Sequence, residues 1–496
     1  MKIVLINPPF IFFKNPRYFP YQCLGLLYIA GYLRENGHEV QIIDAFAEGK
    51  KKVRRIEKDF FIIGLDSASI ISKIESNVDL IGISVPFSHM AQITHNLVQE
   101  IKNTVNIPIV LGGVYPSTQP ELAIQSGADY LVLGDGEEPM LNILDFLDKK
   151  SETLSNSIIT KYSDIKNAKS HYTKDVNTLP FPARDLLPKR LYSGLSARGN
   201  NAHYGWGTAS LITSRGCPYD CEFCEIHPIS GYKWRSYSPS HVLREIDDLY
   251  LNYNISHFEI EDSNFTLDIN RAIEILDGIV ERINKGWSIS WSLPNGVRID
   301  KLSEELILKI KESNCTSVCL ALENGDDEIL SLMRKKLDLK VVLEKVALLA
   351  KYKINTSVFI IYGYPGEKKE NFLNAVKYYE TIKKINPNIQ FRFFLLTPMP
   401  KTKIFQRCVD EGLLPFDFFS KVSDLHVKLL TPEKVWLKTP LFDKKEVLER
   451  KKILINTFSK RGKVKDLIII YTPVFLYKIY KKLKRIVLYK KWNQYN

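Results

Sequence analysis

The sequence lacks most features of secreted and membrane-spanning proteins. It has only 7 cysteines in 496 residues, three of them within eight positions, which favours metal binding in a reducing compartment over a disulfide framework. No signal-like segment precedes the first apolar run at residues 2–7. A later apolar run at 467–477 falls short of the ~20 residues that a spanning helix needs. We therefore expect a cytoplasmic protein.

Most of the chain also lacks an excess of charge. The formal net charge is +13, yet residues 444–496 alone contain sixteen Lys and Arg against three acidic residues, so the preceding part is neutral in sum. This distribution argues against a general nucleic-acid-binding surface and favours one local anionic contact. Because basic and apolar residues alternate in this tail, we expect peripheral binding to an anionic membrane surface. A helix packed on the rest of the chain, with a solvated basic face, is the alternative.

Residues 1–150 alternate apolar runs with helical patterns, which predicts a doubly wound parallel sheet in an α/β domain. Gly112 and Gly113 follow one run, and Gly134 to Glu137 follow another. Open α/β sheets bind ligands at the carboxyl edge of their strands. These glycines therefore form either ligand loops or simple turns.

A polar linker over 151–200 separates this domain from a second α/β segment at 201–405. Six apolar runs alternate there with helical patterns, which predicts a partial (β/α)6 barrel with ligands at the carboxyl ends of its strands. Residues 406–496 are expected to form a mainly helical C-terminal region that includes the basic tail.

Cys217, Cys221 and Cys224 follow the first predicted barrel strand with the spacing C-x3-C-x2-C. Three thiolates on one loop can bind three irons of a 4Fe-4S cubane and leave the fourth iron open. A structural zinc site would recruit a fourth ligand, and His227 is the obvious candidate. Zinc spacings do not usually run C-x3-C-x2-C-x2-H, so the cluster is favoured. The other four cysteines are expected to be small buried hydrophobes.

The cysteine segment, with Phe223 before the last cysteine, resembles the signature of radical S-adenosylmethionine (SAM) enzymes. Segments 231–239, 261–265 and 362–367, with 25–28 and 112–116, are similar to landmarks of the subfamily that has an N-terminal cobalamin-binding-type domain. The resemblance covers residues 1 to about 400. It implies that the open iron chelates SAM and that an electron from flavodoxin or ferredoxin cleaves SAM to a 5′-deoxyadenosyl radical.

The resemblance also implies roles for residues after the barrel strands. Phe223 and the backbone near Gly363 would flank the adenine of SAM. Either Glu261 or Asp262 would receive the methionine ammonium group.

Two further charged residues, Arg298 and Glu323, directly follow predicted strands. They could bind the SAM carboxylate and the ribose hydroxyls respectively, since ionised partners make the stronger hydrogen bonds. A salt bridge at the barrel rim is the alternative for both.

Cobalamin is the third expected cofactor, with Gly112, Gly113, Gly134 and Glu137 as candidate contacts. Cobalamin domains of the methionine synthase type carry an Asp-x-His-x-x-Gly loop whose His ligates cobalt, and none of the nine histidines has that context. Radical SAM relatives often bind cobalamin without this His. Other relatives keep the fold and have lost the cofactor.

Three functions follow from these patterns. The first is cobalamin-dependent methylation of an unactivated carbon. The second is a cobalamin-free radical oxidoreductase or cyclase that forms or oxidises C–C bonds, and the third is a non-catalytic metal-binding protein. The basic tail favours a lipid or lipid-linked substrate.

Overall fold

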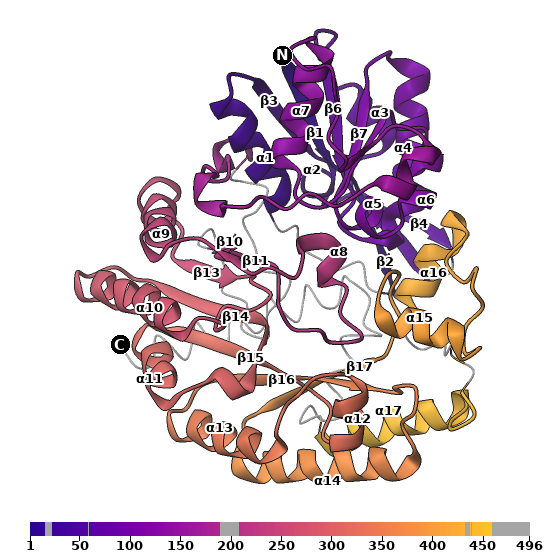
Figure 1. The fold of residues 1–496 in the computed structure, drawn as a ribbon. Helices are drawn as coiled ribbons and strands as arrows, with labels where there is room; N and C mark the ends of the chain where they lie inside the picture. Colours follow the sequence, from indigo (N-terminus) through magenta and orange to yellow (C-terminus); the bar gives the residue numbers. More distant parts are fainter. Residues whose placement is uncertain (15–21, 58, 189–207, 432–436, 438, 459–496) are drawn as a thin grey trace. The chain divides into compact units, whose positions relative to one another are not determined.

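The structure is a computed structural model that describes residues 1–496 except 15–21, 58, 189–207, 432–436, 438 and 459–496 (Figure 1). The chain divides into two compact units, Met1–Arg450 and Lys451–Asn496. The first unit contains both predicted α/β segments, and the following description concerns that unit. The predicted membrane-binding segment 467–477 lies outside the described residues.

The N-terminal part contains a six-stranded sheet with the order β3-β1-β6-β7-β8-β9, in which β9 alone is antiparallel to its neighbour. Buried apolar side chains fill both of its faces, as expected for parallel strands covered by helices. The predicted doubly wound sheet is thus confirmed. The strands are β1 (Lys2–Asn7), β3 (Glu39–Asp44), β6 (Leu80–Ser84), β7 (Ile109–Gly112), β8 (Tyr130–Val132) and β9 (Ile158–Ile159).

Helices cover the two faces of this sheet (Figure 1). On one face, α1 (Leu24–Glu35) packs against α7 (Glu137–Leu147). On the other, α4 (Ala91–Thr104) contributes Leu97 to an apolar cluster that also contains Ile83 of β6. Strand alternation sends neighbouring residues to opposite faces, so each face has its own apolar contacts.

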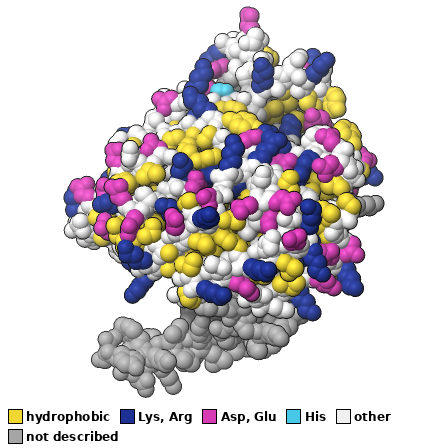
Figure 2. Space-filling view, turned by 60° about the horizontal axis from the view of Figure 1, so that its bottom comes forward, with side chains coloured by type: hydrophobic (Ala, Val, Ile, Leu, Met, Phe, Trp, Pro, Cys, Tyr) yellow, Lys and Arg dark blue, Asp and Glu magenta, His cyan; other side chains and the backbone are white. Residues whose placement is uncertain are grey.

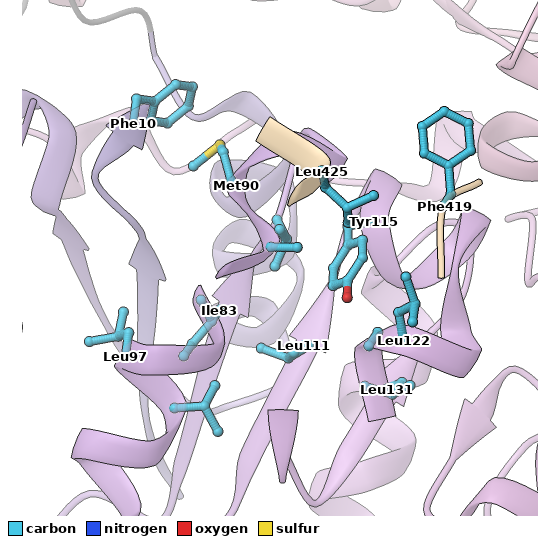
Figure 3. Packing of buried hydrophobic residues seen from close by; sticks show 14 of the residues in the cluster. Phe10, Ile83, Met90, Leu97, Leu111, Tyr115, Leu122, Leu131, Phe419 and Leu425 are labelled. Carbon is cyan, nitrogen blue, oxygen red and sulfur yellow. The ribbon is translucent and has the colours of Figure 1, made fainter. Parts of the chain in front are cut away.

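Segments from the C-terminal region complete the core of the N-terminal part. The apolar cluster that contains Leu111 and Tyr115 also contains Phe419 and Leu425 (Figure 3). Leu425 begins α16 (Leu425–Leu430), which contacts α4. Residues about 300 positions apart in the chain therefore share one core.

A small antiparallel sheet with the order β2-β5-β4 lies beside the main sheet of the N-terminal part. Its strands are β2 (Phe10–Phe13), β4 (Val53–Glu57) and β5 (Phe60–Ile63). Helix α16 contacts β2, and His426 of α16 lies 3.3 Å from Glu57 of β4. The sequence patterns did not predict this sheet.

The second α/β segment forms a parallel sheet whose strands are adjacent in sequence order, β10-β13-β14-β15-β16-β17, with helices on its outer side (Figure 1). This arrangement confirms the predicted partial barrel. Its strands are β10 (Thr208–Leu211), β13 (His257–Ile260), β14 (Ser290–Val297), β15 (Cys315–Glu323), β16 (Thr356–Tyr362) and β17 (Gln390–Leu395). Its main helices are α9 (Pro239–Tyr253), α10 (Ile269–Asn284), α11 (Glu304–Glu312), α13 (Leu339–Lys351) and α14 (Lys369–Ile385).

Two short C-terminal elements follow, α15 (Lys403–Asp410) and, after α16, α17 (Lys444–Phe458). On the face drawn in Figure 2, acidic and basic side chains are interspersed, in line with a neutral body. Among the described residues, no helix is both long and apolar enough to span a membrane.

Candidate active site at the strand ends

The three cysteines lie on the loop that leaves the short strand β11 (Ser214–Arg215), which pairs antiparallel with β12 (Arg235–Ser236). All three thiols are free and partly buried. Burial raises the pKa of Cys217 and Cys221, and it raises the pKa of Cys224 to about 12. Burial thus acts against the thiolate form that binds a metal.

His227, the candidate fourth ligand, is held by the cysteine loop itself. Its Nε2 lies 3.2 Å from the carbonyl oxygen of Cys217, which can only accept, so Nε2 donates. Its ring stacks on Tyr232 with 3.6 Å between ring centroids. Within the described ranges, no group of three His, Cys, Asp or Glu side chains is arranged to hold a single metal ion.

The two acidic residues after β13 have different surroundings. Asp262 is buried and accepts three hydrogen bonds of 2.6 Å, from the backbone N–H and hydroxyl of Thr213 and the hydroxyl of Ser214. It thereby fixes the connection from β10 to the cysteine loop. Glu261 instead lines a cavity, where its Oε2 lies 3.3 Å from the side-chain amide of Asn295.

Arg298 and Glu323 lie beside the cysteine loop in an existing network. The guanidinium of Arg298 lies 4.0 Å from the ring centroid of Tyr219, which stands between the first two cysteines. It also donates to the carbonyl oxygen of Lys335 at 3.1 Å, and the Lys335 ammonium pairs with Glu323 at 3.2 Å. Both predicted residues thus take part in rim contacts close to the cysteines.

Gly363, at the end of β16, is anchored by a buried ion pair. Its backbone N–H donates to Oε2 of Glu367 at 2.9 Å, and the same oxygen lies 2.6 Å from Arg450 of α17. The side chains of Arg450 and Glu367 are 2% and 1% exposed. The C-terminal helix therefore holds the loop that contains Gly363.

A second contact joins that loop to the cysteine loop. The Tyr364 hydroxyl donates to Oε2 of Glu222 at 2.6 Å, and Arg407 of α15 pairs with the other carboxylate oxygen at 3.2 Å. Phe223, the next residue, is partly buried against the apolar cluster that contains Tyr364. The structure thus brings the segments of Phe223 and Gly363 together.

A cavity of about 310 Å³ lies between the N-terminal sheet and the barrel. All four predicted cobalamin contacts line it, namely Gly112, Gly113, Gly134 and Glu137. The barrel side of the wall includes Glu261 and Ser263 after β13, with Arg215 of the cysteine segment. One cavity therefore faces residues of both predicted ligand sites.

The glycines of this wall serve different purposes. Gly113 has φ of +101°, and a Cβ there would lie 2.9 Å from the carbonyl oxygen of Val85, so any side chain would be strained. A Cβ on Gly112 would meet nothing within 4 Å. Glycine is therefore not required at position 112 by backbone strain. Its missing side chain leaves space in the cavity.

Two arginines that the sequence analysis missed, Arg215 and Arg235, connect the two halves of the wall through the predicted loop at 134–137. Arg215 pairs with Glu137 at 2.7 Å and with Asp135 at 3.4 Å, and Asp135 also pairs with Arg235 at 2.5 Å. The sequence analysis also missed Glu225, the residue after Cys224, which does not line the cavity and whose pKa burial raises to about 8. Their position beside the glycine loop and the cysteines was the only signal available in the sequence.

Two family models match the chain. The Radical SAM superfamily matches residues 211–379, and the B12 binding domain matches residues 16–144. An uncharacterized methyltransferase of Pyrococcus horikoshii is 28% identical over 79% of each chain. Cytidylyl-2-hydroxyethylphosphonate methyltransferase of Streptomyces wedmorensis is 27% identical, over 83% of this chain and 82% of the relative.

More distant relatives differ in their reactions. The anaerobic magnesium-protoporphyrin IX monomethyl ester cyclase of Synechocystis is 24% identical, over 76% of this chain and 72% of the relative. Hopanoid C-2 methylase of Rhodopseudomonas palustris is 25% identical, over 63% of this chain and 54% of the relative.

Solved structures share the fold. The cobalamin-dependent SAM radical enzyme OxsB has a TM-score of 0.72 at 18% identity, covering 98% of this chain and 71% of its own. The radical SAM methyltransferase TsrM of Kitasatospora setae has a TM-score of 0.63 at 18% identity, covering 83% and 76%. At this identity the likeness shows the fold alone.

Proposed function

We propose that this chain, a radical SAM enzyme with an N-terminal B12 binding domain, methylates an unactivated carbon with cobalamin as the methyl carrier. The observation that carries this proposal is the shared cavity. Glycine loops of the N-terminal sheet and the cysteine segment of the barrel line the same space. A cofactor held by the first domain would therefore lie next to chemistry started in the second.

The cysteine loop fits a 4Fe-4S cluster. It offers three thiols on one loop, and three thiolate ligands leave the fourth iron of a cubane open for SAM. Burial raises the pKa of Cys217, whereas the nearby ammonium of Lys335 and guanidinium of Arg298 lower it. These cations favour the thiolate form that iron requires. When bound, the cluster supplies the electron that cleaves SAM.

For SAM we assign the ammonium contact to Glu261 and not to Asp262. The Asp262 carboxylate already accepts three hydrogen bonds within the protein. Glu261 lines the cavity and can accept a donor from a ligand there.

The other SAM contacts are proposed from position. Phe223 and the Gly363 backbone would flank the adenine, Arg298 would bind the carboxylate and Glu323 the ribose. Glu323 already neutralises Lys335, so it can accept ribose hydroxyls without an unpaired charge.

The cavity also fits part of a cobalamin. Helices α1 and α7 and the sheet form a mainly apolar wall, with Leu26, Ile29 and Met140 on it and open space above Gly112. A mainly apolar wall suits the apolar parts of a ligand, and about 310 Å³ holds a portion of so large a cofactor. No histidine is among the described residues that line it, which matches relatives that bind cobalamin without a protein ligand to cobalt. When bound, cobalamin supplies the methyl group.

The test uses the full chain, reconstituted with iron and sulfide without oxygen. With SAM and either dithionite or a reduced flavodoxin or ferredoxin, 5′-deoxyadenosine should form. Added hydroxocobalamin should bind at about one cobalt per chain, as absorbance and cobalt analysis would report. Deoxyadenosine without stoichiometric cobalt would reject the methylase proposal.

That outcome would favour the second candidate, a cobalamin-free radical oxidoreductase or cyclase. Its specific support is the similarity to the magnesium-protoporphyrin IX monomethyl ester cyclase of Synechocystis. The third hypothesis, a non-catalytic metal-binding protein, does not agree with the family of enzymes to which the chain belongs.

A lipid or lipid-linked substrate remains our proposal for the acceptor. It rests on the basic tail and on the similarity to hopanoid C-2 methylase. Binding at the cytoplasmic face of an anionic membrane rests on the tail alone, most of which lies outside the described residues.

A further inference from the structure

Arg215 joins the cavity wall of the N-terminal domain to the cysteine loop. Its guanidinium lies 2.7 Å from Glu137 and 3.4 Å from Asp135, both of which line the cavity. It also lies 5.0 Å from the ring centroid of Tyr28 on α1, another wall residue. One side chain therefore contacts three parts of the wall.

The same residue stands directly before the cysteine loop. Only Gly216 separates it from Cys217. In the β11–β12 pair, Arg215 is opposite Arg235, and both arginines pair with Asp135. Arg235 of β12 also donates to the carbonyl oxygens of Thr173 and Ser230, each at 2.8 Å, and these bonds hold the second strand of the β11–β12 pair.

The four charges form a closed and buried set. The side chains of Arg215, Asp135, Glu137 and Arg235 are 10%, 7%, 3% and 3% exposed, and two positive charges face two negative ones. Removing one partner from such a set leaves an uncompensated buried charge. The loop at 134–137 can therefore move only if Arg215 moves with it or the pairs break.

We propose that Arg215 is a positioning residue that couples filling of the cavity by cobalamin to the order of the cysteine loop. This inference rests on the proposed function, because it takes cobalamin as the cavity's ligand. A ligand that fixes the glycine loop fixes Asp135 and Glu137. Through their buried pairs it restrains Arg215, and through Gly216 it restrains the first cysteine.

Hydrogen exchange measured by mass spectrometry tests this coupling on protein that contains its cluster, with hydroxocobalamin as the probe. In the wild type, hydroxocobalamin should slow exchange of the amides at 214–224 about fivefold or more, the lower end of typical coupling between two sites. In Arg215→Gln this slowing should be lost, and Arg215→Lys, which keeps a cation, should restore part of it.

Arg184→Gln is the matched control. Arg184 pairs with Glu245 at 2.8 Å, with side chains 3% and 5% exposed, and neither residue lines the cavity. This variant removes an equally buried pair and should keep the full response. If Arg215→Gln does not fold, Asp135→Asn takes its place, since Asp135 pairs with Arg215 and is not one of the proposed cobalamin contacts.

Cobalt binding, followed by absorbance in the same samples, separates the two proposals. Slowing of equal size in wild type and Arg215→Gln, or no slowing in wild type that binds one cobalt, would overturn the coupling and leave the proposed function standing. A wild type that binds no cobalamin would overturn both.

Discussion

The carboxyl edges of the two parallel sheets face one cavity and are built differently. The N-terminal edge presents glycines and an apolar wall, and its lining includes Gly112 and Met140. The barrel edge contributes Glu261 and Arg215 to the cavity, and away from the cavity it carries charged residues that are already paired, as Glu323 with Lys335 and Glu367 with Arg450. The first edge can select a ligand by shape, whereas the second can orient a small polar ligand and a metal cluster through fixed charges.

The largest expected effect comes from removing the proposed cluster ligands of the barrel edge. Cys217→Ala, Cys221→Ala and Cys224→Ala should each abolish the cluster and SAM cleavage, because two thiolates rarely hold a cubane. Iron and sulfide analysis after anaerobic reconstitution measures this. The matched changes at cysteines outside the loop, Cys315→Ala, Cys319→Ala and Cys408→Ala, should leave the cluster intact. A full cluster in the triple variant would contradict the assignment.

Removing a charge from the barrel edge should cost stability. Arg450→Met leaves the buried Glu367 carboxylate without its partner, at a cost of about 3–5 kcal/mol in the free energy of unfolding. Burial already raises the pKa of Glu367, and loss of the arginine should raise this pKa further. The folded variant then binds a proton more readily than the unfolded chain does.

Its stability should therefore fall as pH rises above the ordinary pKa of a glutamate and through the raised pKa of Glu367, which denaturant unfolding at several pH values measures. The double variant Arg450→Met with Glu367→Gln should recover part of the loss. A pH-independent loss would show that packing of α17, and not charge, holds the Gly363 loop.

Adding volume to the N-terminal edge should affect cobalamin alone. Gly112→Phe would place a side chain in the cavity without backbone strain, since a Cβ there meets nothing within 4 Å. Hydroxocobalamin affinity should fall about ten- to hundredfold by absorbance titration, the equivalent of overpacking by 1–3 kcal/mol. Gly112→Ala should have a small effect, and both variants should keep their iron. Unchanged affinity in Gly112→Phe would place cobalamin elsewhere.

Glu261 and Asp262, the two acidic residues after β13, are expected to have different roles, the first in SAM binding and the second in stability. Glu261→Gln should weaken SAM binding about tenfold, as expected when one charge-assisted hydrogen bond is lost, and should leave the melting temperature unchanged. Asp262→Asn should lower the melting temperature, because Asp262 accepts bonds from Thr213 and Ser214. Equilibrium dialysis with SAM and thermal unfolding measure both. The reverse pattern would exchange the proposed roles.

The basic tail belongs to neither edge and should give the smallest effect. The full chain should sediment with anionic vesicles more than a chain that ends at Lys465, and the difference should shrink as salt is added. Neutral vesicles are the control. Equal recovery of both proteins would remove the main reason to expect a lipid substrate.

Local patterns sufficed to predict both sheets and the cysteine loop. Strands such as β1 and β16 are continuous apolar runs, and the spacing of Cys217 to Cys224 lies within one loop. The position of Gly112 at the carboxyl edge of the sheet was also predicted, because a glycine pair follows a strand there, whereas its role as a ligand contact stays a prediction. These signals need no knowledge of which segments meet in space.

Contacts between distant segments could not be predicted in this way. Arg215 and Glu137, which form an ion pair, are 78 positions apart in the chain. Nothing in the sequence around either residue indicates that the two would meet. The β2-β5-β4 sheet is too short for a clear period. From the sequence, Asp262 was as good a candidate for the SAM ammonium contact as its neighbour Glu261. The hydrogen bonds that Asp262 accepts come from Thr213 and Ser214, 49 and 48 positions earlier, and could not be predicted.

The shared core of Tyr115, Phe419 and Leu425 has a consequence for how the chain is made (Figure 3). At about 5–20 residues per second, a ribosome needs roughly 15–60 seconds to extend the chain from Tyr115 to Leu425. Early in that interval the synthesis of β8 and β9 completes the N-terminal sheet, yet Phe419 and Leu425, which pack on its core, have not been synthesised. Nascent-chain chaperones should bind this surface, and an excised N-terminal domain should aggregate unless residues 403–430 are supplied with it.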